Sequence, residues 1–400
     1  MLMSSASGLT FWGIVATLGP LAAAGSIIGV LPHSYKVLVL LIGPLFVPFG
    51  NFTMGILTDR IGRKKIFLIT MIMYGIGIVI ISLSYTFIPL IIGLMLAEFG
   101  VGGEEIPSLS LVSEDSPISQ RAKWLTIISD FDNIGSAIIA GLFLVLVTSF
   151  ADRVVLLLAA SFLIIVMIFS RLSLPESFKW ENIHGKVENS IKTRSSLYID
   201  SAGETVKKPS YTLTLSVLMA MAISQYTTFG LMAYIIGPYE FPGVFTDDMI
   251  IFVALLGASV AGFIAAPLIT RGRKKYTLYS YGLGFISTVA IFLVIPLLNN
   301  VLIFYPLLFF NMMMSEFAWA SRTTLEPELS PTRIRGIFMG TVRLAPMIVY
   351  PLLVYLTSNV SIRVFIIINV GLWLLGFIAA IVWHHYGIET AKVNIDYPEA

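Results

Sequence analysis

The sequence predicts an all-α polytopic membrane protein whose twelve transmembrane helices form two pseudo-symmetric six-helix bundles. Three observations lead to this fold class: an apolar composition, twelve apolar stretches along the chain, and two short motifs that occur once in each half. Hydrophobic residues make up 57% of the 400 residues and charged residues only 12%. Soluble proteins carry roughly 25% charged residues, so lipid must be the solvent for most of this surface.

The apolar stretches are each about 20 residues long, which is the length that a helix needs to cross a bilayer. They form two sets of six. By residue number the first set is 10–30, 37–57, 66–84, 87–112, 124–148 and 153–172, and the second is 211–236, 249–269, 276–297, 301–325, 337–357 and 362–384. The long polar segment 173–210 predicts a cytoplasmic linker between an N-terminal bundle (1–172) and a C-terminal bundle (211–385), with residues 386–400 as a cytoplasmic tail.

Lysine and arginine are distributed unevenly among the loops. Twenty of the 25 fall in alternate loops, in the linker or in the tail, all on one side of a twelve-helix chain. Because cytoplasmic loops carry the excess of basic residues, we expect both termini to face the cytoplasm and the protein to lie in the cell membrane. No basic segment or small-residue cleavage site precedes the first apolar run, so no signal peptide is predicted.

The composition also argues against several classes of function. The chain has no cysteine and four histidines, of which His384 and His385 are adjacent, so neither a disulfide nor a metal site is expected. With 25 basic against 23 acidic residues there is no electrostatic basis for binding nucleic acid. No nucleophile–base set is present, and the glycines at 100–103 precede Glu104 and Glu105, which would repel a phosphate. We therefore expect neither an enzyme nor a cofactor.

Two motifs are repeated between the halves of the chain. They are Gly-Arg-Lys-Lys at 62–65 and 272–275, and a spaced set at Glu114, Pro117 and Arg121 that returns at Glu328, Pro331 and Arg335. The bias of basic residues toward one side of the membrane does not fix the Glu–Pro–Arg spacing. We therefore expect the two bundles to derive from an internal duplication.

These motifs resemble the major facilitator superfamily. The segment Gly-Ile-Leu-Thr-Asp-Arg-Ile-Gly-Arg-Lys-Lys at 55–65 is similar to the signature between its second and third helices. The Gly-Val-Gly-Gly-Glu run at 100–104, the Pro-Glu-Ser at 175–177 and the Glu-Leu-Ser-Pro-Thr-Arg-Ile-Arg-Gly at 328–336 are similar to its sugar-porter, metabolite:proton symporter and organic-ion transporter branches. The resemblance implies a monomeric secondary transporter with alternating access, in which helices 1, 4, 7 and 10 line a central site.

The chain departs from the family pattern in four respects. The first predicted helix contains no acidic residue, Leu94 stands where relatives often have an arginine, and Glu98 replaces a glycine. In the second half, Ile269 takes the position that corresponds to Asp59. The usual proton-coupling residues are therefore not carried over to this chain and must be sought among its own intramembrane charges.

Eight charged residues fall within the central helices, where each costs at least about 2.5–3.5 kcal/mol at the bilayer centre. The acids are Glu98, Glu104, Glu105, Asp130, Asp132 and Glu316, and the bases are Arg322 and Arg343. At least four acids must be protonated, hydrated or matched by a cation, and because desolvation disfavours a charged carboxylate we expect them to couple proton movement to transport. Glu105 and Asp132 are the favoured candidates. The alternative is that some acids only form structural pairs with the arginines.

A polar stripe on the helix at 301–325 predicts one wall of the substrate cavity. Its members share one helical face: Asn311, Ser315, Trp319, Arg322 and Glu326. The alternative is that these residues only join neighbouring helices by hydrogen bonds. Gln225 and Tyr226, on a helix that the resemblance places at the central site, and Arg343 complete the candidate substrate-binding set.

The loop motifs supply candidate gate residues. They are Asp59, Arg60, Arg63, Glu114, Arg121, Arg273, Glu328 and Arg335. The resemblance implies that such residues form cytoplasmic salt bridges that break when the inner gate opens, and we expect Arg63 to pair with Glu114, and Arg121 with Glu328 or with the acidic neighbours of Arg335. Asp59 is an acid among basic residues, for which the bias of loop charge gives no reason.

Together these observations predict a secondary active transporter that uses the proton gradient for symport of a small polar metabolite. Guanidinium groups bind carboxylates bidentately, so Arg322 and Arg343 favour an organic acid, and the Pro-Glu-Ser motif makes a sugar the next choice. The surplus of acids leaves a proton-driven organic-cation or drug antiporter as the alternative, and a non-transporting membrane receptor as a further one.

Overall fold

The structure is a computed structural model that describes residues 2–117, 119–146, 149–166, 209–241, 243–297, 300–330 and 335–391. Within these ranges the chain forms helices and the turns between them. The N-terminal half contains α1 (Leu2–Ala24), α2 (His33–Ile61), α3 (Arg63–Ser82), α4 (Phe87–Asp115), α5 (Arg121–Ser129), α6 (Phe131–Val145) and α7 (Ser149–Val166). The C-terminal half contains α10 (Tyr211–Gly230), the π-helix η3 (Leu231–Ile235), α11 (Ile236–Glu240), α12 (Val244–Ile269), α13 (Arg273–Leu293), η4 (Ile295–Leu297), α14 (Val301–Glu328), α15 (Arg335–Leu356), η6 (Thr357–Asn359) and α16 (Ile362–Tyr386).

Each of the twelve predicted spans corresponds to a helix, which confirms the predicted fold class. Eleven described spans are long and apolar enough to cross a membrane, with α5 and α6 forming one span and α10, η3 and α11 another. The twelfth, α7, is described for residues 149–166. Most of the linker at 173–210 and of the tail at 386–400 lies outside the described residues, so the domain boundaries stay a prediction.

The first helix begins earlier than the sequence predicts. α1 starts at Leu2 rather than at residue 10, because Leu9 in its early turns is buried in a cluster with Ile106 of α4 and Leu125 of α5. The helix ends before Gly25, whose φ of 110° lies in the left-handed region that glycine adopts without steric cost. Hydrophobicity alone placed the start too late because Ser4 and Ser5 are polar and yet buried inside the protein.

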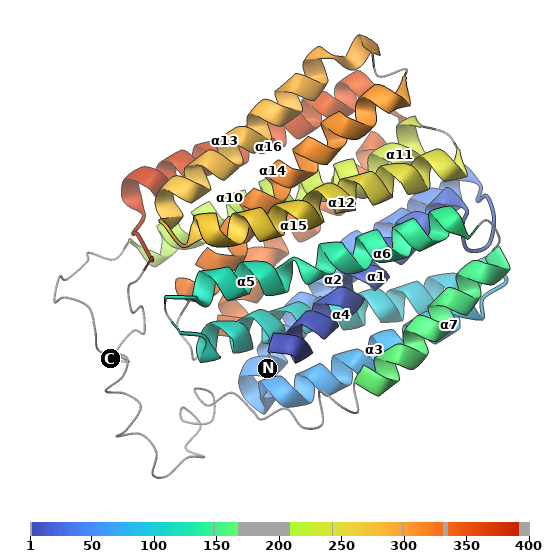
Figure 1. Cartoon of the computed structure of the whole chain (residues 1–400), viewed down its shortest axis with the longest axis horizontal. Coiled ribbons are helices and arrows are strands. Elements are labelled where there is room, and N and C mark those ends of the chain that lie inside the picture. Colours follow the sequence, from blue (N-terminus) through green and yellow to red (C-terminus); the bar gives the residue numbers. More distant parts are fainter. Residues whose placement is uncertain are drawn as a thin grey trace.

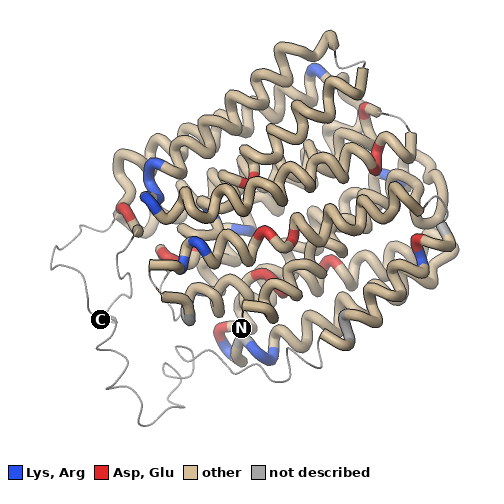
Figure 2. Tube along the Cα trace, in the orientation of Figure 1, with Lys and Arg blue, Asp and Glu red and all other residues tan. Residues whose placement is uncertain are grey.

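The two halves of the chain lie side by side, as Figure 1 shows by its change of colour from blue and green to yellow and red. The N-terminus lies at the end of the molecule that carries the turns α2–α3, α4–α5 and α12–α13. We call this the motif end, because the repeated motifs lie there, and the opposite end the far end. Figure 2 shows the basic residues gathered mainly at the motif end, whereas acidic residues also occur midway along the helices.

The halves meet chiefly along two helix pairs, α2 with α15 and α6 with α12. At the first crossing Gly55 and Gly336 allow the backbones to touch: a Cβ on Gly55 would lie 2.9 Å from the carbonyl oxygen of Gly336, and one on Gly336 would lie 2.6 Å from that of Gly55. Those distances are shorter than a carbon–oxygen contact allows. A side chain at either position would therefore separate the bundles at the motif end.

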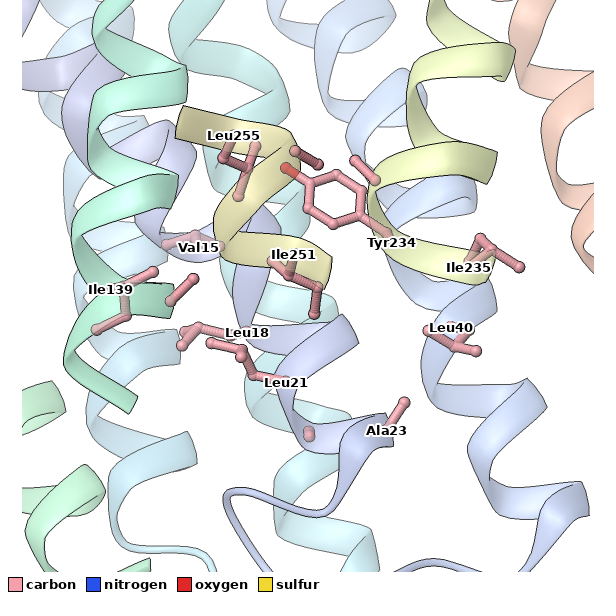
Figure 3. Close-up of a cluster of buried hydrophobic side chains, with 14 of the residues drawn as sticks. Val15, Leu18, Leu21, Ala23, Leu40, Ile139, Tyr234, Ile235, Ile251 and Leu255 are labelled. Carbon is pink, nitrogen blue, oxygen red and sulfur yellow. The ribbon is translucent and has the colours of Figure 1, made fainter. Parts of the chain in front are cut away.

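A large hydrophobic cluster joins the halves toward the far end. Figure 3 shows Leu18 of α1, Ile139 of α6 and Ile251 of α12 in this cluster, together with Tyr234 and Ile235 of the π-helix η3. All five side chains are at most 9% exposed. The cluster fixes η3 against α1 and so places Tyr234 beside the central space between the bundles.

Candidate substrate and proton site

A cavity with two lobes lies between the bundles, about half-way along the helices. The first lobe has a volume of about 60 Å³ and is lined by residues of α1, α2, α4, α10, η3 and α15, including Glu98 and Tyr350. The second has a volume of about 30 Å³ and is lined by residues of α1, α6, α10, η3 and α14, including Asp132 and Glu316. The two share four aromatic side chains: Trp12, Tyr226, Phe229 and Tyr234. We call them the aromatic lobe and the acidic lobe.

Local backbone structure creates the aromatic walls. The α-helix α10 passes into the π-helix η3 after Gly230, and such single-turn insertions are frequent at functional sites because they shift the side chains that follow. Gly230 has no side chain, and a Cβ there would overlap the ring of Tyr350. Tyr226 and Tyr350 meet edge to face with ring centres 5.7 Å apart, and Phe229 and Tyr234 do so at 5.9 Å.

Three carboxyl groups surround Asn133 beside the acidic lobe, which Asp132 and Glu316 line. Nδ2 of Asn133 on α6 donates to Oε2 of Glu316 on α14 at 2.8 Å and to Oδ1 of Asp130 at 3.2 Å. Asp132 accepts from the backbone N–H of Asn133. Asp130 sits at the break between α5 and α6, facing Gly262 of α12, where a Cβ would overlap its carboxyl. All four polar residues are at most 8% exposed, and the Asn133–Glu316 bond links the two bundles.

A second buried network contains both intramembrane arginines. Nη1 of Arg322 lies 2.7 Å from Oε1 of Glu326, and Nη2 of Arg343 lies 3.1 Å from Oε2 of the same residue. Arg343 also pairs with Glu105 of α4, which connects the C-terminal bundle to the N-terminal one. We call these four residues the Arg–Glu network; its two positive and two negative groups balance.

The Arg–Glu network reaches the cavity through two side chains. Arg322 Nη2 donates to Oε1 of Gln225 at 3.3 Å, and its guanidinium carbon lies 4.4 Å from the ring centre of Trp319. Arg343 lies 5.6 Å from the same ring. Gln225 and Trp319 both line the acidic lobe, so both guanidinium groups stand directly behind its wall.

The predicted polar stripe on α14 is divided between two environments. Trp319 and Arg322 lie at or behind the cavity wall, as expected. Asn311 instead donates to Ser287 and Thr288 of α13 at 2.8 and 2.9 Å, so it joins helices within the C-terminal bundle. Ser315 is buried and lines neither lobe. Glu316, which is not part of the stripe, lines the acidic lobe together with Trp319.

The acids of α4 also lie in different places. Glu98 lines the aromatic lobe, and Glu105 belongs to the Arg–Glu network. Glu104 points into the N-terminal bundle, where Thr70 of α3 donates to it at 2.9 Å. The three acids are all buried, at no more than 2% exposure.

At the motif end, Asp59 bridges the bundles. Its carboxylate accepts the backbone N–H groups of Gly336 at 3.3 Å and Ile337 at 3.0 Å, at the start of α15. A helix N-terminus carries free N–H groups and a partial positive charge, so it attracts a carboxylate. Asp59 is 8% exposed, whereas the neighbouring Arg60 is exposed to the surroundings.

The other predicted gate residues differ in part from expectation. Glu328 pairs with Arg273 of α13, with Nη2 to Oε1 at 3.1 Å, and not with Arg121; the Nε of Arg121 has no hydrogen-bond partner among the described residues. The reason is that α13 and α14 are neighbours in one bundle. Arg335 donates to Ser330. The side chains of Arg63 and Glu114 lie outside the described part of the chain, as does Pro331.

Comparison with known proteins identifies the fold and the family. The sequence model described as Major Facilitator Superfamily matches residues 1–345. The chain belongs to the major facilitator superfamily. It is therefore a transporter and not an enzyme.

The relatives of this major facilitator protein are metabolite and sugar transporters. It is 28% identical over 295 residues to NiaP, a candidate niacin/nicotinamide transporter of Bacillus subtilis strain 168, covering 73% of this chain and 70% of NiaP. It is 25% identical over 390 residues to YdjE, an inner membrane metabolite transport protein of Escherichia coli K12, covering 87% and 83%. Its structure superposes on the proton:xylose symporter XylE with a TM-score of 0.78 at 14% identity, covering 99% of this chain and 97% of XylE.

Several residues that shape the site of this superfamily member were absent from the sequence prediction. Glu326 was predicted as a member of the polar stripe but not as the partner of Arg322, although it follows Arg322 by four positions, a spacing that favours pairing on a helix. The sequence provides no comparable indication of a role for Asn133, Trp12 or Tyr350. An apolar or amide residue within an apolar helix gives the same sequence pattern whether it lines a cavity or packs against a neighbouring helix.

Proposed function

We propose that this transporter is a proton-coupled symporter of a small heteroaromatic organic acid, of the niacin class. The observation that carries the proposal is a cavity between the bundles whose aromatic walls border buried carboxyl groups and, behind them, two guanidinium groups. The proton gradient would supply the energy, with the motif end in the cytoplasm of the cell, and the chain would act as a monomer.

The aromatic walls favour a flat solute. Stacked and edge-to-face contacts between rings add about 0.5–1.5 kcal/mol to the burial of their surface, and Trp12, Tyr226, Phe229, Tyr234 and Tyr350 offer five such rings. A sugar needs many hydrogen-bond partners around its ring instead. The name of NiaP supports the same class, because niacin is a pyridine carboxylic acid.

The Arg–Glu network offers a way to couple the acid to a proton. A substrate carboxylate that enters the acidic lobe beside Gln225 and Trp319 would compete with Glu105 for Arg343. Glu105 can leave its guanidinium partner without an uncompensated buried charge only if it takes up a proton. One proton would therefore accompany each carboxylate, and the exchange would loosen the contact between α4 and α15.

One observation favours a second candidate function. The charged residues that line the two lobes are Glu98, Asp132 and Glu316, all of them acids. Aromatic rings and carboxylates together bind organic cations. Proton-driven export of an organic cation is therefore the second candidate, and it predicts the opposite proton movement.

Proton flux in proteoliposomes that contain a pH dye separates these functions. Niacin, nicotinamide, xylose, myo-inositol and an organic cation would each be added outside at equal concentration. We expect niacin to acidify the lumen faster than in protein-free liposomes, a control that is needed because neutral niacin crosses lipid by itself. Acidification by a sugar alone would contradict the substrate class, and alkalinisation by the cation alone would establish an antiporter. Flux without proton movement for every solute would contradict proton coupling.

A further inference from the structure

Glu98 has no part in the exchange between Glu105 and the substrate carboxylate. It projects from α4 into the aromatic lobe, is 1% exposed, and its Oε2 has no hydrogen-bond partner among the described residues. It is also the only acidic or basic side chain among the described residues that line this lobe. A carboxyl group that is removed from water without a partner is strongly disfavoured, so the site is incomplete without a group that pairs with Glu98.

The space around this carboxyl is kept free by two glycines. A Cβ on Gly43 of α2 would lie 3.6 Å from Oε1 of Glu98, and a Cβ on Gly19 of α1 would lie 3.9 Å from it. Any larger side chain at these positions would therefore pack on the carboxyl and cover it. The backbone of α1 and α2 thus leaves Glu98 accessible from the cavity, although it is closed off from the surroundings.

The rings of the aromatic lobe restrict what can reach Glu98. Tyr226 and Tyr350 stand at 83° to one another, and Phe229 and Tyr234 at 76°. Faces and edges of rings therefore both border the space, which suits a planar solute that presents its own edge to a polar group. A protonated carboxyl has one O–H donor, and a pyridine-type nitrogen has a lone pair in the plane of its ring.

We propose that Glu98 is a specificity residue that recognises the ring nitrogen of an N-heteroaromatic substrate; this inference rests on the function proposed above. The protonated carboxyl donates to the ring nitrogen, while the ring packs against Tyr226 and Phe229. If the proton moves, the O–H bond of Glu98 breaks as the N–H bond of the ring forms, and the resulting carboxylate accepts a charge-assisted hydrogen bond. Whether the proton lies on the carboxyl oxygen or on the ring nitrogen, Glu98 has a hydrogen-bond partner.

This arrangement also orients the solute. Tyr226 and Phe229 line both lobes, so a ring whose nitrogen meets Glu98 extends toward the acidic lobe. Its carboxylate then lies on the side of Gln225 and Trp319, in front of the Arg–Glu network. Glu98 therefore binds the ring nitrogen of the solute, and Arg343 binds its carboxylate.

The test is a comparison of three ligands that differ only at the ring nitrogen. Niacin, benzoate, which lacks the nitrogen, and N-methylated niacin, whose nitrogen has no free lone pair, would be titrated calorimetrically into the purified full-length chain at one pH. Leaving a buried polar group unpaired reduces affinity by about 10- to 100-fold, so we expect niacin to bind that much more tightly than either analogue. Equal affinity of niacin and benzoate would overturn the assignment without any variant.

Three variants locate the effect at Glu98. We expect Glu98→Leu to abolish or reverse the preference for niacin over benzoate, since benzoate then leaves no polar group unpaired whereas the ring nitrogen of niacin has lost its donor. Glu98→Gln should retain most of the preference, because an amide N–H also donates to the nitrogen. Glu104→Gln, a matched change on the same helix whose side chain points to Thr70, should leave the ratio of the two affinities unchanged.

The outcomes separate this inference from the proposed function. If niacin binds and Glu98→Leu keeps the full preference, Glu98 is not the specificity residue and the proposed function stands. If N-methylated niacin binds more tightly than niacin, the lobe is a cation site and the hydrogen bond is wrong. If neither niacin nor benzoate binds the wild-type chain, the proposed substrate class fails and this inference fails with it.

Discussion

Asp59→Asn should weaken the contact between the bundles at the motif end. The carboxylate of Asp59 accepts two backbone N–H groups at the start of α15. Hydrogen bonds to a charged group contribute about 1.5–3 kcal/mol each, and a charge at a helix N-terminus adds about 0.3–1 kcal/mol. Asparagine keeps one acceptor oxygen and loses the charge, so we expect a net loss of about 1–2 kcal/mol, or about 5- to 30-fold in the ratio of separated to packed bundles.

The absence of cysteine from the sequence provides the assay. Ser110 of α4 is fully buried and contacts Met339 of α15 across the bundle interface, with 4.0 Å between its Oγ and the sulfur. A Ser110→Cys substitution changes little in size and creates a single thiol that becomes reactive only when the bundles separate. The rate of its alkylation by a small membrane-permeant reagent should rise about 5- to 30-fold in Asp59→Asn, the factor derived above.

Arg60→Gln is the matched control, because it changes the charge of the adjacent residue. Arg60 is exposed, so its loss should alter the alkylation rate by less than about twofold, as for most surface substitutions. Equal alkylation rates in Asp59→Asn and in the wild-type background would show that the two backbone hydrogen bonds do not hold the bundles together. Opposite changes of similar size in the two variants would show that net loop charge, and not the helix N-terminus, sets the equilibrium.

Three further predictions follow from the buried groups. Glu105→Gln should abolish accumulation of niacin driven by a pH gradient while counterflow exchange continues, because the amide cannot take up a proton. If accumulation persists in this variant, the proton-coupling residue is Asp132 or Glu98 instead. Asn133→Ala should lower the free energy of unfolding by about 1–3 kcal/mol, because it leaves Asp130 and Glu316 without their shared donor, and an unchanged thermal midpoint in detergent would contradict this. Gly262→Ala should cost about 1–3 kcal/mol, since its Cβ would overlap the carboxyl of Asp130, whereas Gly371→Ala, with nothing within 4 Å of the added carbon, should be neutral or stabilising.

The fold could be predicted almost completely from the sequence, because the requirement to cross a bilayer acts on each helix separately. Twenty apolar residues in a row suffice to indicate a span, whatever the rest of the chain does. The start of α1 was wrong because it depends on a tertiary contact: Leu9 is held by residues of α4 and α5. The break at Asp130 and the π-helix at 231–235 likewise depend on neighbours that lie far away in the sequence.

The site could be predicted from the sequence mainly in its charged members, together with Gln225, Tyr226 and Trp319. A charge inside a membrane is conspicuous, so Glu98, Glu105 and Glu316 were found without knowledge of their surroundings. Which neighbour each one meets depends on helix rotation, and an error of one residue turns a side chain by about 100°. Asn311 therefore turned out to face α13, and Glu328 to pair with Arg273 rather than Arg121.

The intramembrane charges divide into groups that have different consequences for coupling. Arg322, Arg343, Glu105 and Glu326 balance one another. Asp130 and Glu316 instead share the side-chain amide of Asn133, and Asp132 accepts the backbone N–H of Asn133; none of these three acids has an arginine or lysine among its described hydrogen-bond and ion-pair partners. An acid that shares an amide can stay protonated throughout the cycle, since a neutral carboxyl keeps its hydrogen bond with Asn133. A carboxylate that is paired with a guanidinium group must take up a proton before it can leave that group, because it would otherwise remain as an unpaired buried charge.

Two links between the bundles therefore respond differently to the same motion. In the proposed cycle, opening the cavity toward the motif end breaks the pair of Glu105 with Arg343, which requires both a proton for Glu105 and a competing carboxylate for Arg343. Separation of Asn133 from Glu316 breaks one hydrogen bond and requires neither. We therefore expect the coupling between substrate and proton to arise at Glu105. We expect the carboxyl groups around Asn133 to hold the two bundles together without setting the number of protons that move with each substrate.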